Sequence, residues 1–74
     1  MDIENLVRMA NRIGTFFEAM PDHEEAVRDV ALHLAKFWDP RMRSELLRHF
    51  EESGSDGLRP IVIEAVSRHR EMLS

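Results

Sequence analysis

Four histidines are the residues best suited to metal binding or proton transfer, and they stand far apart in the chain. They are His23, His33, His49 and His69. No two are three or four residues apart, so no helix presents a histidine pair to a metal ion. Cysteine is absent, which excludes a thiolate nucleophile, a cysteine zinc site and cysteine ligands for an iron–sulfur cluster. The sequence therefore predicts no metal site.

Adjacent carboxylates are the next candidates for chemistry, at Glu24-Glu25 and Glu51-Glu52. Both pairs fall at expected helix ends, where capping and solvation account for them, and nothing encloses them in the cleft that acid–base catalysis requires. The chain also lacks a serine nucleophile elbow and a glycine-rich phosphate loop. A chain of 74 residues leaves little volume for a pocket that excludes water. We expect no active site.

The charge pattern argues against nucleic acid as a partner. The net charge is −4 with histidine neutral, whereas binding to phosphates needs a basic face. Arg41 and Arg43 follow the tight Asp39-Pro40 turn, as in a helix-turn-helix, but that turn lacks the usual glycine. We interpret these arginines, together with Arg48, as a solvated helix face.

The chain also lacks the signals of a membrane or secreted protein. No apolar stretch approaches the roughly 18 residues that a membrane helix requires. The opening residues are acidic, where a secretory signal is basic. We therefore expect a soluble, cytoplasmic protein.

Apolar residues recur with helical spacing in four segments, and none of the chain shows convincing strand alternation. The expected helices span about residues 2–19, 22–38, 40–52 and 59–72. Asp22 and Asp39 are typical N-cap residues, Pro40 suits the first position of a helix, and Gly54 suits a helix end. Short connections between short helices predict one all-α domain over residues 1–74, a compact bundle with antiparallel helices. The alternative is a looser arrangement in which one helix docks only onto a partner.

Each expected helix carries one apolar stripe for the core. In the second helix this stripe includes Phe37 and Trp38, and in the third it includes Phe50. Gly14 lies on the stripe of the first helix. A glycine inside a helix costs about 1 kcal/mol relative to alanine, so we expect a neighbouring helix to approach closely there.

Three apolar residues fall away from these stripes: Phe16, Leu32 and Ile63. Single exposed apolar residues are normal, but three on separate helices of a small domain indicate a second buried surface. The alternative is a more fully packed bundle in which all three belong to the core. The sequence leaves both interpretations open.

Three segments resemble the delta subunit of the soluble NAD-dependent formate dehydrogenases. They are NLVRMANRIG at 5–14 followed by FF at 16–17, FWDPRMR at 37–43, and GLRP at 57–60. The order and spacing of the segments agree with that family over about residues 3–72. Arg59 departs from the pattern, because a small capping residue such as serine is expected before Pro60. We therefore expect a weak cap on the fourth helix.

The resemblance implies a role in a larger enzyme. Enzymes of this kind are cytoplasmic complexes that oxidise formate to carbon dioxide and reduce NAD. The large (alpha) subunit holds a molybdenum or tungsten bis-pterin guanine dinucleotide and iron–sulfur clusters, and other subunits carry FMN and further clusters. The delta subunit binds none of these. The resemblance thus implies a non-catalytic accessory subunit that assists assembly, stability or molybdenum-cofactor insertion of the large subunit.

Tryptophan and arginine are enriched at the energetic centres of protein interfaces, and both types occur at the corner between the second and third helices. We predict that this corner, with two arginines of the first helix, contacts the large subunit. The predicted interface comprises Arg8, Arg12, Phe16, Leu32, Trp38, Pro40, Arg41, Arg43 and Ile63. Two alternatives stay open: Trp38 belongs to the core and the arginines are solvated, or the chain is a freestanding homodimeric interaction module.

Overall fold

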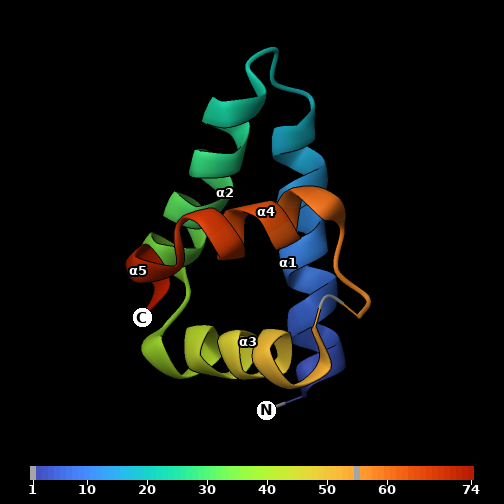
Figure 1. Ribbon diagram of the computed structural model, residues 1–74, viewed down its shortest axis with the longest axis vertical. Coiled ribbons are helices and arrows are strands. Elements are labelled where there is room, and N and C mark those ends of the chain that lie inside the picture. Colours follow the sequence, from blue (N-terminus) through green and yellow to red (C-terminus); the bar gives the residue numbers. More distant parts are fainter. Residues whose placement is uncertain (1, 55) are drawn as a thin grey trace.

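The computed structural model describes residues 2–54 and 56–74, and most of them lie in helices (Figure 1). The helices are α1 (Ile3–Glu18), α2 (His23–Phe37), α3 (Pro40–Ser53), α4 (Pro60–Arg68) and α5 (Arg70–Leu73). No strand occurs in the described part of the chain, so the all-α fold predicted from the sequence is confirmed. Among the same residues, no helix combines the length and apolar character that crossing a membrane requires.

Helices α1 and α2 form a hairpin, α3 and α4 lie across it, and the short α5 lies beside α2 (Figure 1). Helix α4 crosses both arms of the hairpin, and α3 crosses its open end. The antiparallel alignment that we predicted for all the helices holds for α1 and α2 but is wrong for α3 and α4. Only Trp38 and Asp39 link α2 to α3, and both are extended, so α3 leaves at a steep angle instead of turning back along α2.

Aliphatic side chains from all five helices form one core. Its centre lies where α4 crosses the hairpin, and its fully buried side chains include Val30 and Leu34 of α2 and Val62 and Val66 of α4. No polar or charged residue among those described is buried. The core is therefore held by apolar burial, at roughly 25 cal/mol per Å² of apolar surface removed from water.

Helix ends follow the predicted capping residues closely. The carboxylates of Asp22 and Asp39 accept hydrogen bonds from the backbone N–H groups of Glu25 (3.2 Å) and Met42 (3.0 Å). Gly54 ends α3 with a φ of 66°, in the left-handed region that glycine tolerates best. Arg59 supplies no side-chain cap to α4, as its departure from the family pattern predicts.

The last predicted helix, over residues 59–72, is wrong in its C-terminal part. Helix α4 ends at Arg68, and His69 has φ −121° and ψ 36°, outside helical geometry. The chain then turns back, so that α5 lies against α2 and α3 and Leu73 is buried. Packing of this last turn favours the break, which the sequence does not mark with glycine or proline.

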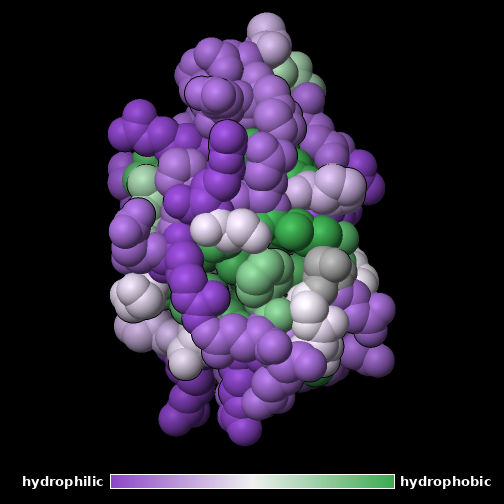
Figure 2. All heavy atoms as spheres, viewed as in Figure 1, coloured by the Kyte–Doolittle hydropathy of each residue, from purple (hydrophilic) through white to green (hydrophobic). Residues whose placement is uncertain are grey.

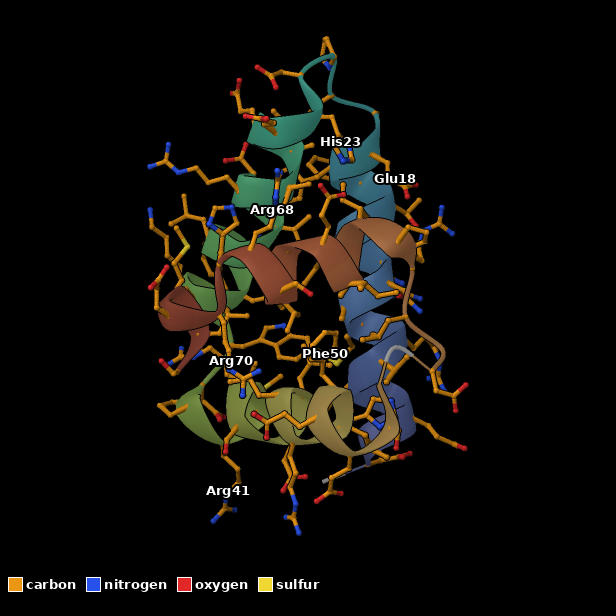
Figure 3. All side chains as sticks on the ribbon, viewed as in Figure 1. Glu18, His23, Arg41, Phe50, Arg68 and Arg70 are labelled. Carbon is orange, nitrogen blue, oxygen red and sulfur yellow. The ribbon has the colours of Figure 1, made fainter. Side chains whose placement is uncertain are left out.

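Apolar side chains also show on the surface between α3 and α4, on the side of the molecule drawn in Figure 2. Phe50, which we predicted to be buried, lies in this region (Figure 3) and is half-buried. It packs against the core with one side. This patch is thus the edge of the core, exposed where the two crossing helices diverge.

Candidate docking surface

Four aromatic rings form a row across the hairpin, from α1 to α2. The ring centroids of Phe16 and Phe17 lie 5.1 Å apart at an interplanar angle of 87°. Phe17 is 6.1 Å from His33, and His33 is 4.7 Å from Phe37. Such edge and tilted contacts are the favoured geometries for aromatic pairs. The row joins the two arms of the hairpin at the surface, outside the core.

A groove of ≈ 500 Å³ runs beside this row. We call the surface that lines it the aromatic face: Met9, Arg12, Ile13, Phe16, Phe17, His33, Phe37 and Trp38. Its outer parts are strongly exposed, with 73% of Phe16 and 71% of Phe37 open to solvent. Its floor includes Trp38, of which only 5% is exposed.

Local spacing explains how the helices build this face. On α1, Met9, Ile13 and Phe16 are separated by four and three residues, which places them along one side of a helix. On α2, His33 and Phe37 are four residues apart and stack one turn above the other. This spacing of apolar and aromatic residues on each arm is the signal that could have located the face from the sequence.

The aromatic face exposes more large apolar side chains than an ordinary solvated surface does. Apolar patches with polar edges on small domains mark sites where proteins or ligands bind. Phe16 and Phe37 are the large hydrophobic residues with the greatest exposure among those described. A larger hollow, of ≈ 850 Å³, lies between α2 and the end of α4, but six of its seven lining residues are charged or histidine. We therefore take the aromatic face as the candidate docking surface.

Three of the predicted interface residues come together here, and a fourth lies nearby. Arg12, Phe16 and Trp38 line the groove itself. Leu32 is half-buried and lines a shallower hollow on the other side of His33 and Phe37. Phe37 was missed, because we predicted it to be buried, and that prediction is wrong. Met9, Ile13, Phe17 and His33 were not predicted for the interface either.

One other predicted residue of the corner, Arg43, has partners within the chain. Arg43 donates from Nη1 to the carbonyl oxygens of Ala35 (2.9 Å) and Trp38 (2.8 Å), and from Nε to that of Leu73 (3.3 Å). It thereby ties the end of α2 to α5. Trp38 is part of the core, as the alternative interpretation held. Arg43 is therefore not a solvated arginine.

The remaining predicted residues lie apart from the aromatic face. Arg8 is exposed on α1 and donates to the Oδ1 of Asn5 (3.2 Å). Pro40 and Arg41 are exposed at the start of α3, where Arg41 points away from the rest of the molecule (Figure 3). Ile63 is half-buried and packs against the core. Their contacts with the large subunit stay predictions.

The family model for the NADH-dependent formate dehydrogenase delta subunit, FdsD, matches residues 5–66. The chain belongs to this family. No curated protein and no solved structure matches it. The matched range contains every residue of the aromatic face and ends before α5. The resemblance predicted from the sequence is confirmed, and this delta subunit carries its candidate docking surface inside the part that defines the family.

The described residues of this delta subunit contain no group of three or more histidine, cysteine, aspartate or glutamate side chains placed to hold a metal ion. His23 instead bonds to Glu64 (2.8 Å), and His49 bonds to the carbonyl oxygen of Asp56 (3.1 Å). His33 is the histidine on the aromatic face. Its ring stands between those of Phe17 and Phe37, so its geometry fits packing within the face.

Proposed function

We propose that this delta subunit is a non-catalytic accessory subunit of a cytoplasmic NAD-dependent formate dehydrogenase, and that it binds the large subunit through the aromatic face. Bound there, it assists assembly, stability or molybdenum-cofactor insertion of that subunit. The observation that carries the proposal is the exposure of Phe16 and Phe37 at one groove, on a chain whose family is named as a subunit of a larger enzyme.

The binding free energy that the two exposed phenylalanines can supply supports the proposal. Burying a phenylalanine side chain completely gives about 1.5–3 kcal/mol, and most of each ring is still available for burial by a partner. Two such rings supply roughly 10²–10⁴-fold in a dissociation constant, since every 1.4 kcal/mol is tenfold. Buried aromatic anchors commonly dominate binding energy at protein interfaces.

Redox chemistry belongs, in this proposal, to the partner subunits. They would hold the molybdenum or tungsten bis-pterin guanine dinucleotide, the iron–sulfur clusters and FMN. The delta subunit has no cysteine with which to ligate a cluster. Its contribution is therefore a binding surface, which favours one state of the large subunit by binding it more tightly than others.

Co-purification from cells that express all subunits, with an affinity tag on the large subunit, tests the docking surface. Phe16→Ser combined with Phe37→Ser should lower recovery of the delta subunit at least tenfold. The matched control is Arg28→Ser with Glu71→Ser, two exposed residues whose joint replacement leaves the net charge unchanged. Arg28 lies nine residues before Phe37, two and a half helical turns away and so on the opposite side of α2. Equal recovery of both variants would contradict the proposal.

A second measurement separates the three kinds of assistance. Large subunit purified from cells with and without the delta subunit is compared for molybdenum or tungsten content, for the amount of assembled complex and for the half-life of activity on heating. Lower metal content indicates a role in cofactor insertion, less complex a role in assembly, and a shorter half-life a role in stability. No difference in any of these would overturn the accessory role.

The alternative function is a freestanding homodimeric module, in which two aromatic faces mate. Exposed phenylalanines are compatible with it, because a two-fold interface pairs the same patch on both copies. Light scattering of the isolated chain at low micromolar concentration distinguishes the homodimeric module from the accessory subunit. A stable dimer that does not dissociate when the large subunit is added would favour the homodimeric module.

A further inference from the structure

We infer that the aromatic face receives an apolar segment of the large subunit that carries a carboxylate, and that this carboxylate pairs with Arg12. The inference rests on the proposed function, because it names the chemistry of the partner at the same surface. It adds something that the family name does not contain: the sign of the charge that the partner must present beside its apolar anchor.

The charges at the groove carry the inference. The whole chain has a net charge of −4, yet the groove is lined by one arginine and no carboxylate. Arg12 is exposed, and none of the ion pairs between described residues involves it. A permanent cation beside exposed aromatic rings fits an apolar segment with an acidic residue, since complementary charge sets specificity at interfaces.

The other edge of the aromatic row carries a second cation. Lys36 is exposed and lines the shallower hollow with Leu32, on the far side of His33 and Phe37 from Arg12. Asp29 also lines that hollow, so the positive charge of Lys36 is balanced by a carboxylate there. The positive charge of Arg12 at the main groove has no carboxylate beside it. The unbalanced position is therefore Arg12.

The shape of the groove fits an inserted side chain. Phe16 and Phe37 stand at its exposed parts, while Trp38 is buried below and Met9 and Ile13 are half-buried. Methionine adapts its flexible thioether to the shape of an apolar neighbour. A bulky apolar side chain entering between the two phenylalanines would cover both and bring its neighbouring residues beside Arg12.

A second copy of the chain fits this surface less well. Residues near the axis of a two-fold dimer meet their own copies, so two aromatic faces would bring two Arg12 side chains toward one groove that has no carboxylate. Like charges opposed in this way are unfavourable. The observations thus favour a different chain with an acidic residue over self-association.

Charge variants and cross-linking of the assembled complex test the inference. Arg12→Glu should lower co-purification with the large subunit at least tenfold, whereas Arg12→Lys should lower it less than threefold. Lys36 is the only lysine of the chain, so Arg12→Lys adds a single new side-chain amine. A carbodiimide, which joins amines to carboxylates in contact, should then link position 12 to an aspartate or glutamate of the large subunit. Arg28→Lys, on the opposite side of α2, is the matched control and should give no such link.

The outcomes separate the proposed docking of the large subunit from the inferred pairing of Arg12 with a carboxylate. If the wild-type complex is recovered, but Arg12→Glu has no effect or position 12 gives no link to the large subunit, the inference is overturned and docking stands. A link from position 12 to a second copy of this chain also overturns it. If the wild-type chain is not recovered with the large subunit, the proposed function itself fails, before any variant is compared. Circular dichroism of Arg12→Glu verifies that its helices are intact.

Discussion

Gly14 lies so close to Val62 that a Cβ atom at position 14 would come within 2.8 Å of the Val62 Cγ2 methyl, and within 2.9 Å of the Ile61 Cγ2 methyl. Both methyls belong to buried, β-branched residues of α4, which have little freedom to move away. This contact explains a glycine in the middle of α1. It also fixes how closely α4 crosses the hairpin, which confirms the close approach expected from the sequence.

Gly14→Ala is expected to destabilise the fold. Overpacking costs about 1–3 kcal/mol, and the gain in helix propensity returns about 1 kcal/mol, so the free energy of unfolding should fall by about 1 kcal/mol. Urea denaturation followed by the fluorescence of Trp38, the single tryptophan, measures it. In a Val62→Ala background the cost of Gly14→Ala should shrink, because one of the two opposing methyls is gone. An undiminished cost in that background would contradict the explanation.

Asn11 connects α1 to the segment that leads into α4. Its Nδ2 donates to the carbonyl oxygen of Gly57 (2.8 Å), and its Oδ1 accepts from the backbone N–H of Arg59 (2.9 Å). With net values of about 0.5–1.5 kcal/mol per hydrogen bond, loss of both bonds in Asn11→Ala should lower the free energy of unfolding by about 1–3 kcal/mol. Asn5→Ala is the control, because the side-chain amide of Asn5 bonds only to residues of α1 and connects no other segment. Equal unfolding midpoints in urea for the two variants would refute this role.

Arg43 should matter far more to stability than Arg41, although both were predicted from the sequence to contact a partner. Each hydrogen bond to a charged group contributes about 1.5–3 kcal/mol, so Arg43→Ala, which leaves three carbonyl acceptors without it, should cost at least about 2–3 kcal/mol. Arg41 is exposed, and Arg41→Ala should change stability by less than about 0.5 kcal/mol. Thermal unfolding monitored by circular dichroism compares them. Similar melting temperatures for both variants would show that the Arg43 contacts are weak.

This contrast also restricts how the predicted corner is tested. Arg43→Glu would remove the contacts that tie α2 to α5, so lost binding in that variant would not separate docking from misfolding. Arg41→Glu leaves those contacts in place. Co-purification of Arg41→Glu with the large subunit is therefore the measurement that decides whether the corner takes part in docking.

Sequence reasoning succeeded where a local pattern determines the structure. Asp22 and Asp39 cap the helices that follow them because each carboxylate reaches N–H groups three residues ahead. It failed where contacts distant in the sequence decide. Arg43 bonds to Leu73, 30 residues away, and no local signal announces that partner. The break at His69 likewise follows from packing of α5 on α2 and α3.

Sequence reasoning found only three of the eight residues of the aromatic face: Arg12, Phe16 and Trp38. Helical periodicity assigned Phe37 and Trp38 to the same buried stripe, but α2 ends at Phe37 and Trp38 is extended, with φ −86° and ψ 138°. The Trp38 N–H nonetheless bonds to the carbonyl oxygen of Leu34 (3.1 Å), so Trp38 keeps the helical position one turn after the buried Leu34, and the 100° rotation per residue turns Phe37 away from it. Phe16 was found because it falls away from the apolar stripe of its helix, and Arg12 because it is an arginine on the polar side of that helix.

Phe37 and Trp38 give the sharpest separation between binding and folding, because neighbours in the chain have opposite surroundings. Phe37→Ser should change the free energy of unfolding by less than about 1 kcal/mol, since 71% of the side chain is already exposed. Trp38→Ala should cost about 3–5 kcal/mol through the cavity that it leaves, comparable to the total stability of about 3–5 kcal/mol that a core of this size supplies. Far-UV circular dichroism in urea serves both variants, because it does not depend on the tryptophan. Phe37→Ser should keep native helicity and lose the large subunit, whereas Trp38→Ala should lose helicity first. If Phe37→Ser unfolded the chain as Trp38→Ala does, Phe37 would be a core residue and the aromatic face would lose its main anchor.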